Sequence, residues 1–430
     1  MKKLGKVLRH TLRSHENPKH LHGAFRFPAR LHHRVSSTLI QAYSRPGSTI
    51  CDPFVGCGTN QLEAAIHGRN SLGYDVDPLS VFITKAKLGA LHFSESELRR
   101  YGNLLLGKIE NCRRGRDYES LMFADISRLN GAAKRAALSA ASTDLIKRWF
   151  RRYVIQDLAI ILETIRATRA PAELKHLALL SFASILRSCS NADPVPVSGL
   201  EYTKRMRERD LEGRRIDPFS LYEKRLARTI FQAIEFLQSS NSVSNHATFN
   251  HDITRHWPSD ERYDLLMFSP PYLSAVEYSR RHKLEMAWLS LIDTHADFLT
   301  LSRKYIGHRI TGKEPVEIEP FGDPYIDRIR KSLLHIDYRR ARAFIRYCHQ
   351  MHAFFGHAAL HMHKKAKLVT VIGDNTVAGI RILSDRVMSA VAEPLTLSEQ
   401  HTYPLRNRYM TYTRHNGADI CAERILVFSR

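Results

Sequence analysis

The feature that most constrains the fold is a glycine loop between a short apolar segment and a helix near the start of the chain. Thr49-Ile-Cys51 is apolar, and Asp52-Pro-Phe-Val-Gly-Cys-Gly-Thr59 follows it directly. Asn60 to His67 has the pattern of a helix, and Ser71 to Asp75 has the pattern of a second strand. Strand, glycine turn, helix and strand in this order predict the βαβ unit of a parallel, doubly wound sheet.

The rest of the chain indicates a larger α/β fold of the same kind with a long helical insertion. We expect a basic N-terminal arm at 1–23, a sheet domain made of 24–90 and 245–430, and a helical insertion at 91–244. Further strands are expected at 247–249, 263–268, 367–372 and 424–428, and helices at 30–43, 149–168, 172–187, 221–238, 283–291 and 325–362. The fold class is therefore a doubly wound, mostly parallel sheet, Rossmann-like, with added helices.

The composition of the chain limits the kind of binding partner and the cellular compartment that we expect. The chain has 430 residues, and 65 lysines and arginines exceed 43 acidic residues, which gives a formal charge of +22. This excess favours nucleic acid as the partner, although a basic soluble protein without such a partner has the same signature. No apolar run is long enough to span a membrane and no secretory signal is visible, so we expect a cytoplasmic protein. The six cysteines form no CxxC pair, which argues against a zinc ribbon and a disulfide scaffold.

The glycine loop has the features of a small-ligand site. Gly56 and Gly58 let the backbone approach a ligand, and the helix that begins near Thr59 directs its N–H groups toward a carboxylate. Asp75, at the second strand end, can accept hydrogen bonds from ribose hydroxyls; the alternative is a solvated turn residue. A dinucleotide site would have a third glycine where this chain has Gln61. S-adenosylmethionine, which has a carboxylate, a ribose and an adenine but no pyrophosphate, fits better.

A second motif, Ser269-Pro-Pro-Tyr272, follows the apolar segment 263–268. The exocyclic amine of a nucleobase is a poor nucleophile because its lone pair is delocalised into the ring. The Ser269 hydroxyl and the Pro270 carbonyl can accept hydrogen bonds from such an amine, with Pro270 and Pro271 fixing the backbone. Tyr272 can stack on a base that has left its duplex. This chemistry needs no metal and no covalent intermediate; the alternative is an ordinary rigid turn.

The two motifs resemble the donor and catalytic motifs of amino-group DNA methyltransferases, most closely the cytosine-N4 branch. The resemblance implies S-adenosylmethionine as the methyl donor and a methyltransferase catalytic domain in 24–90 and 245–430. It implies that Phe54, Gly56 and Gly58 meet the methionine part of the donor and that Asp75 meets its ribose. Other donor-site residues follow from the same resemblance: Asp52, Pro53 and Thr59 in the loop, Asp252 on the adenine amine, and Phe27 and Pro28 in a segment that lines the pocket.

The base and the nucleic acid are less constrained. Serine ahead of the two prolines is more usual in the cytosine-N4 group and Asp or Asn in adenine-N6 enzymes, so we expect cytosine, with adenine as the alternative. A DNA-modifying role follows from the resemblance only, either beside a cognate restriction endonuclease as the protective half of a restriction system or as an orphan methylase. An RNA base methyltransferase would use the same chemistry, and an inactive nucleic-acid-binding protein on this scaffold is a further alternative.

The densest basic run of the helical insertion is a candidate contact with phosphates, which position nucleic acid without specifying its sequence. It consists of Arg205, Arg207, Arg209, Arg214 and Arg215. Glu208, Asp210 and Glu212 lie within the same run, so a solvated, self-balanced loop is an equal alternative. All of these expectations depend on the glycine loop and the Ser-Pro-Pro-Tyr motif opening onto one crevice.

Overall fold

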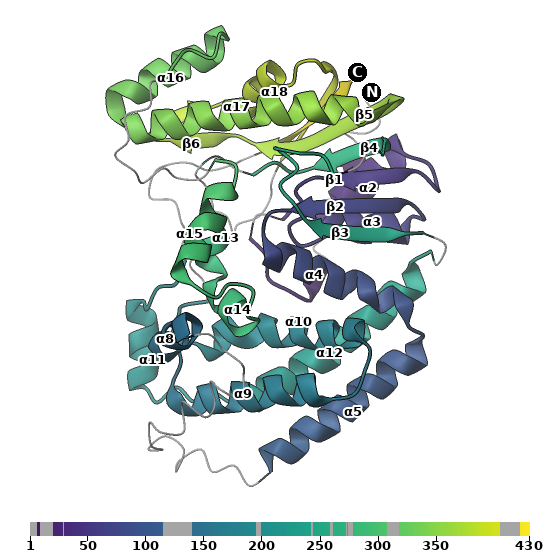
Figure 1. The fold of residues 1–430 in the computed structure, drawn as a ribbon, viewed down its shortest axis with the longest axis vertical. Coiled ribbons are helices and arrows are strands. Elements are labelled where there is room, and N and C mark those ends of the chain that lie inside the picture. Colours follow the sequence, from purple (N-terminus) through teal and green to yellow (C-terminus); the bar gives the residue numbers. More distant parts are fainter. Residues whose placement is uncertain are drawn as a thin grey trace.

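The computed structural model describes residues 7–8, 20–28, 30–114, 140–194, 199–241, 244–258, 261–271, 273, 278–307, 318–404 and 422–430. Within these residues the main sheet has the strand order β3-β2-β1-β4-β5-β9-β8 (Figure 1). The strands are β1 Thr49–Asp52, β2 Asn70–Asp75, β3 His246–Asn250, β4 Tyr263–Phe268, β5 Met362–Gly373, β8 Thr396–Pro404 and β9 Ala422–Ser429. The strands β3, β2, β1, β4 and β5 are parallel to one another, and β9 is antiparallel to both β5 and β8. The predicted doubly wound, mostly parallel fold class is confirmed.

Helices cover both faces of this sheet, which explains why its central strands are almost continuously apolar. Leu265 and Met267 of β4 belong to the core beneath α2 (His33–Tyr43) and α3 (Thr59–Ile66). Leu266 and Phe268 belong to the core beneath α17 (Tyr338–Leu360) and α18 (Ser384–Val391). Successive side chains of a strand point to opposite faces, so one short segment supplies both cores.

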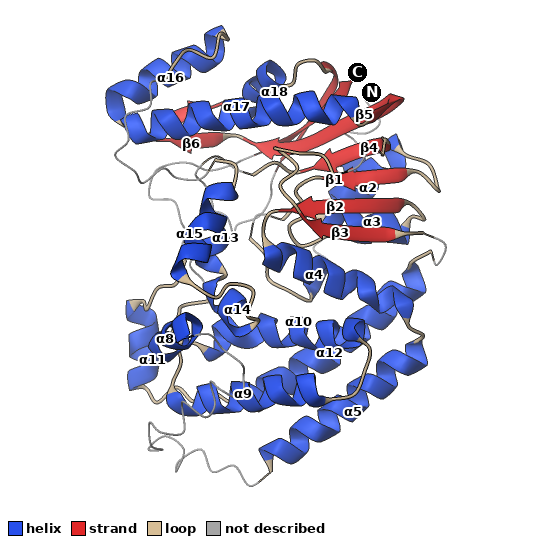
Figure 2. Cartoon of the chain, viewed as in Figure 1, coloured by secondary structure: helices blue, strands red, loops and turns tan. Residues whose placement is uncertain are grey.

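A second body of helices lies below the sheet in the view of Figure 2. It contains α5 Glu95–Arg113, α8 Ala140–Trp149, α9 Arg152–Ala167, α10 Ala172–Cys189, α11 Lys204–Leu211 and α12 Pro218–Ser239. Helix α4 (Pro78–Leu88) also contributes to its core, as does α14 (Lys283–Trp288), which follows the Ser-Pro-Pro-Tyr motif. The Trp288 ring packs edge-on against the rings of Phe150 and Phe182, with centroids 5.8 and 5.7 Å away. The chain beyond the second motif is therefore anchored in the helical body.

Part of the basic N-terminal segment is packed rather than exposed. Its last residues form the short 3-10 helix η1 (His20–Gly23), in which Leu21 and His22 are buried. The His22 imidazole lies 2.8 Å from the Glu63 carboxylate of α3. Residues 1–6 and 9–19 of the predicted arm lie outside the described residues.

The structure differs from the predicted elements in its C-terminal part. The expected helical stretch 325–362 is two helices, α16 (Pro324–Ile336) and α17, because Asp337 interrupts it. The Asp337 carboxylate accepts hydrogen bonds from the backbone N–H groups of Arg339 and Arg340, so it caps the second helix. Strand β8 and the hairpin of β6 (Asn375–Val377) and β7 (Ile380–Ile382) have no counterpart in the prediction. In the described chain, no helix combines the length and the apolar character that crossing a bilayer requires.

Candidate active site

The glycine loop leaves the end of β1 and turns into the start of α3. Gly56 and Gly58 have left-handed backbones, with φ angles of +50° and +80°. A Cβ on Gly58 would lie 2.8 Å from two atoms of the Thr84 side chain, and a Cβ on Gly56 would lie 3.4 Å from the Phe27 ring. Both positions therefore require glycine for backbone conformation, and Gly58 also requires it for space.

Asp75, at the end of β2, holds this loop in place. Its Oδ2 accepts a hydrogen bond from the Gly56 N–H at 2.9 Å, and its Oδ1 accepts one from the Asp77 N–H at 2.9 Å. Burial, helped by the nearby Asp77 carboxylate, raises the pKa of Asp75 to about 7. Each carboxylate oxygen has a second lone pair, so Asp75 remains able to accept from a ligand hydroxyl.

Asp52 and Asn60 join the loop to the neighbouring strand. Asp52 accepts hydrogen bonds from the Phe54 N–H at 3.1 Å and from the Asn60 side chain at 2.9 Å. The Asn60 amide also donates to the carbonyl of Met267 in β4 at 2.9 Å. Burial raises the pKa of Asp52 to about 7. One buried amide thus connects the glycine loop to the strand that carries the second motif.

Lys87 of α4 supports the loop from below. Its side chain is fully buried, and its ammonium group donates to the carbonyl of Cys57 at 2.7 Å. Burial lowers the pKa of Lys87 to about 8. The loop is therefore fixed on one side by a carboxylate and on the other by a buried amine.

The Ser-Pro-Pro-Tyr motif begins where β4 ends, beside the glycine loop. β4 is parallel to β1, with Ile50 paired to Leu265 and Cys51 paired to Leu266. The carboxyl ends of parallel neighbours meet at one edge of a sheet, and the strand order reverses between these two strands. Ser269 and Pro271 accordingly line the same cavity as Gly56. Tyr272 lies outside the described residues.

This cavity encloses about 880 Å³, including the part open to solvent. Most of the residues expected to hold a donor line it: Phe27, Asp52, Pro53, Phe54, Gly56, Thr59, Asp75 and Asp252. Pro28, Gly58 and Pro270 are not on its wall. One cavity therefore joins the glycine loop, the acidic strand end and the start of the second motif.

Three consecutive residues on the cavity wall had no sequence signal. Lys304, Tyr305 and Ile306 come from the end of α15 (His295–Lys304) and the turn after it. No local pattern distinguishes them from other helix ends. Asp77 also lines the cavity, and it did have a signal, because an Asp-Pro pair before an apolar segment is typical of a helix start. Its carboxylate accepts a hydrogen bond from the Leu79 N–H and caps α4.

Asp252 is both a turn residue and a residue of the cavity wall. Its Oδ1 accepts hydrogen bonds from the Thr254 N–H at 3.2 Å and the Thr254 hydroxyl at 2.6 Å. Its Oδ2 lies 3.3 Å from the Arg255 guanidinium. His251, Ile253 and Thr254 line the cavity with it. The turn after β3 therefore presents one carboxylate and one apolar side chain to the ligand space.

Aromatic rings fix two side chains of the wall. The Phe54 ring lies 5.3 Å from the Phe268 ring and 5.1 Å from the Phe354 ring of α17. The Phe27 ring lies 5.2 Å from the imidazole of His282. His282 is buried, and burial lowers its pKa to about 3, so it is neutral at physiological pH. Both walls of the cavity are thus backed by packed rings.

The five arginines of the basic run in the insertion do not share one environment. Arg205, Arg207, Arg209 and Arg215 are exposed on or just after α11. Arg214 instead turns inward, where its side chain donates to the Asp210 carboxylate at 2.6 Å and to the Ser190 carbonyl. Arg214 therefore has a structural position, and a phosphate contact from the exposed members stays a prediction. Across the described residues, no group of three or more His, Cys, Asp or Glu side chains is arranged to hold a metal ion.

Comparisons with known proteins find DNA methylases and type II methyltransferases among the proteins similar to this chain. A family model described as DNA methylase (N6_N4_Mtase) matches residues 2–85. The type II methyltransferase M.MvaI of Kocuria varians is 23% identical over 365 residues, covering 82% of this chain and 76% of that protein. The type II methyltransferase M.MjaII of Methanocaldococcus jannaschii is 30% identical over 73 residues, covering 17% of this chain and 14% of that protein. The structure of the rRNA methyltransferase aviRa from Streptomyces viridochromogenes covers 94% of this chain and 89% of its own with 9% identity and a TM-score of 0.33, too low to support a conclusion.

Proposed function

We propose that this chain, which is similar to amino-group DNA methyltransferases, transfers a methyl group from S-adenosylmethionine to the N4 amine of cytosine at a specific DNA sequence. The observation that carries this proposal is that Gly56 and Ser269 line one cavity. Donor and amine can then meet without any large movement of the sheet. A DNA substrate is also in line with the cytoplasmic location expected from the sequence.

The cavity suits the chemical parts of the donor. The N–H groups at the start of α3 favour a carboxylate, and Asp75 is free to accept from ribose hydroxyls. A Cβ on Gly56 would contact the Phe27 ring at 3.4 Å, so glycine keeps the loop backbone close to this aromatic side chain of the cavity wall. Phe54 and Ile253 offer apolar surface on the same wall. When bound, S-adenosylmethionine supplies an electrophilic methyl group on a positively charged sulfur.

The second motif prepares the amine that receives the methyl group. The Ser269 hydroxyl and the Pro270 carbonyl accept hydrogen bonds from the two amine hydrogens, which draws the nitrogen lone pair out of the ring and toward the donor. Holding the amine and the methyl carbon in contact raises the rate, because the two reactants then react within one complex. The nitrogen forms the new bond as the bond from carbon to sulfur breaks, and the amine proton leaves to water afterwards.

Cytosine is the proposed base because serine occupies position 269. Adenine N6 is the alternative within the same family, and an RNA base is the alternative outside it. A cognate restriction endonuclease is proposed as a genetic partner, since relatives of this chain carry the name type II methyltransferase.

The proposal is tested by expressing the chain in a host without DNA methylation and sequencing that DNA for modified bases. N4-methylcytosine at one recurring sequence is the expected result. Ser269→Ala should abolish it, while Ser389→Ala, which changes an exposed serine on α18 far along the chain, should leave it intact.

The other outcomes discriminate among the alternatives. N6-methyladenine in the DNA would show that the target base is adenine instead of cytosine, while the transfer of a methyl group to an exocyclic amine of DNA would stand. Methylated RNA beside unmodified DNA would favour the RNA enzyme. Intact donor binding without methylation of either nucleic acid would favour an inactive binding protein.

A further inference from the structure

Five basic side chains gather at one edge of the cavity. We call them the rim cluster: Arg255, Arg303, Lys304, Arg342 and Arg346. Lys304 lines the cavity itself, and with Arg303 it ends α15. Arg342 and Arg346 lie one turn apart on α17, and Arg255 lies in the turn after β3. Three elements that are distant in sequence therefore bring positive charge to the same place.

Arg346 connects the members of the rim cluster. Its guanidinium donates a hydrogen bond to the Arg303 carbonyl at 3.2 Å, which ties α17 to the end of α15. Burial, and then the positive charges of Arg342 and Arg255, lower the pKa of Arg346. Arg255 lies 3.3 Å from Asp252 on the cavity wall. The Arg346 hydrogen bond and the Arg255 ion pair thus connect α17 and the turn after β3 to elements that line the ligand space.

Like charges lie close together within the rim cluster. Arg342 and Arg346 are at i and i+4 of α17, an arrangement that opposes helix formation. The Arg255 side chain is 77% exposed, so its contact with Asp252 is a weak surface ion pair that another anion can replace. A surface of this kind is stabilised when an external anion binds to it.

We infer that the rim cluster binds the backbone phosphates of DNA on either side of the nucleotide that enters the cavity. This inference rests on the proposed function. A base must leave its duplex to reach Ser269, and the unstacking must be offset by contacts with the strand that moves. Lys304, on the cavity wall, is placed for the phosphate nearest the target base. Arg346 and Arg342 follow along α17 and are placed for phosphates further from it.

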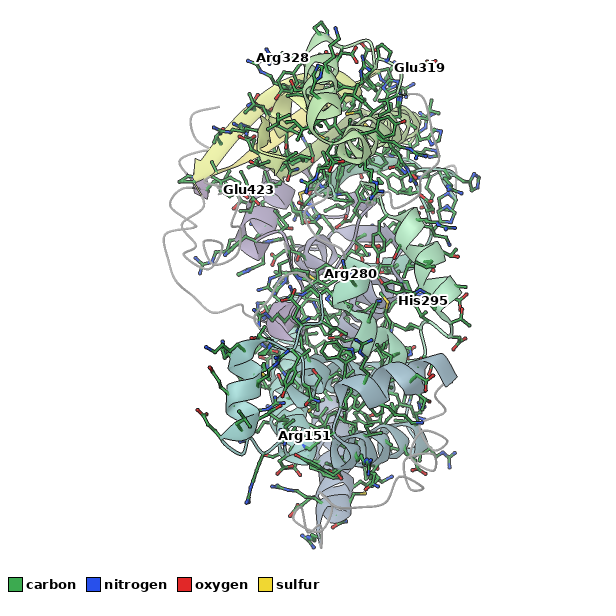
Figure 3. All side chains as sticks on the ribbon, turned by 90° about the vertical axis from the view of Figure 1, so that its left-hand side faces the viewer. Arg151, Arg280, His295, Glu319, Arg328 and Glu423 are labelled. Carbon is green, nitrogen blue, oxygen red and sulfur yellow. The ribbon has the colours of Figure 1, made fainter. Side chains whose placement is uncertain are left out.

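The position of α15 gives the side from which DNA approaches. Figure 3 shows His295, the first residue of α15, and Arg280 at mid-height on one side of the molecule. Arg328 of α16 is near the top of the same view and Arg151 beside the helical body is near the bottom. A duplex on this side would reach α15, whose last residue Lys304 lines the cavity, and would have the helical body within reach.

The test measures binding of the full chain to an unmodified duplex across a range of salt concentrations. The logarithm of the affinity falls linearly as the logarithm of the salt concentration rises. Removing one positive charge that contacts a phosphate should make this negative slope shallower by about 0.9. We expect Arg342→Gln and Arg346→Gln each to show this drop, and the double variant to show both. Arg342→Lys, which keeps the charge, should retain the slope. Arg340→Gln is the matched control, because Arg340 is on the same helix but is paired with Asp337 at 3.3 Å.

S-adenosylmethionine binding, measured by calorimetry, should be unchanged in all of these variants. An unchanged salt slope in the folded Arg342→Gln protein, with donor binding and methylation of DNA intact, would overturn the inference and leave the proposed function standing. Tighter binding of an RNA duplex than of the DNA duplex would also overturn it. Failure of the unsubstituted chain to methylate any DNA would instead count against the proposed function.

Discussion

Replacement of Gly58 by alanine separates the two reasons for glycine in the donor loop. The backbone of Gly58 is left-handed, with φ of +80°, and its added Cβ would lie 2.8 Å from Thr84. Gly47 has nearly the same backbone, with φ of +83°, but nothing lies within 4 Å of its Cβ position. The two glycines therefore share the strain and differ in the steric overlap.

The magnitudes follow from these two terms. A left-handed alanine costs roughly 1–2 kcal/mol. Overlap inside a packed region costs roughly 1–3 kcal/mol more. We expect Gly47→Ala to lower the free energy of unfolding by about the first amount and Gly58→Ala by about the sum of both. The change in the unfolded chain is common to both variants and cancels in their difference.

Urea denaturation of both variants measures the free energies, and calorimetry with S-adenosylmethionine measures donor affinity. Adding Thr84→Ala to Gly58→Ala removes the atoms that the new Cβ would overlap. The double variant should therefore regain the stability lost to overlap but not the stability lost to the left-handed backbone. Donor affinity should fall for Gly58→Ala and stay unchanged for Gly47→Ala. Equal stability losses for the two single variants would refute the steric argument.

Three further predictions concern buried polar groups. Asn60→Leu leaves Asp52, the Met267 carbonyl and the Ser36 hydroxyl without their amide partner. We therefore expect a loss of about 3–5 kcal/mol in the free energy of unfolding. A loss below about 1 kcal/mol would contradict the role of Asn60 in linking the loop to β4. Arg214→Ala should lower stability by about 2–4 kcal/mol in the same assay, while the exposed Arg205→Ala should change it by less than about 0.5 kcal/mol. Burial raises the pKa of Glu285 from its ordinary value of 4.5 to about 7, so this group favours the folded state below pH 4.5 and loses that contribution as the pH rises to 7. Glu285→Gln should therefore flatten the decline in stability between these pH values, and an unchanged pH profile would argue against a buried, protonated Glu285.

The elements around the glycine loop were predictable because their signals are local. The apolar segment at β1, the loop glycines and the helix pattern of α3 lie within twenty residues of one another. The strand at 263–268 was predicted at its observed bounds because it is a continuous apolar run with a Ser-Pro-Pro stop. The break at Asp337 was missed because apolar spacing continues through both α16 and α17 and only the cap reveals the end.

Parts of the site had no comparable signal. Lys304, Tyr305 and Ile306 reach the cavity because α15 packs between the sheet and the helical body, and nothing in their own neighbours indicates this. Nothing near His282 in the sequence indicates that it is buried, because its ring contacts Phe25 and Phe27, which lie near the start of the chain. Arg214 looks like a member of a surface run until Asp210 and the Ser190 carbonyl are placed beside it.

By itself the sequence determined the βαβ unit, the left-handed glycine turn and the strand that carries the Ser-Pro-Pro-Tyr motif. These follow from the periods of strands and helices and from the conformations that glycine and proline allow, which are properties of adjacent residues. Only the tertiary structure decided that β1 and β4 are neighbours. The Thr49 N–H and the Asp264 carboxylate, which are 215 residues apart in sequence, meet at 2.8 Å because the folded core packs the two strands together. The shared cavity and its positive rim exist only once that pairing has formed.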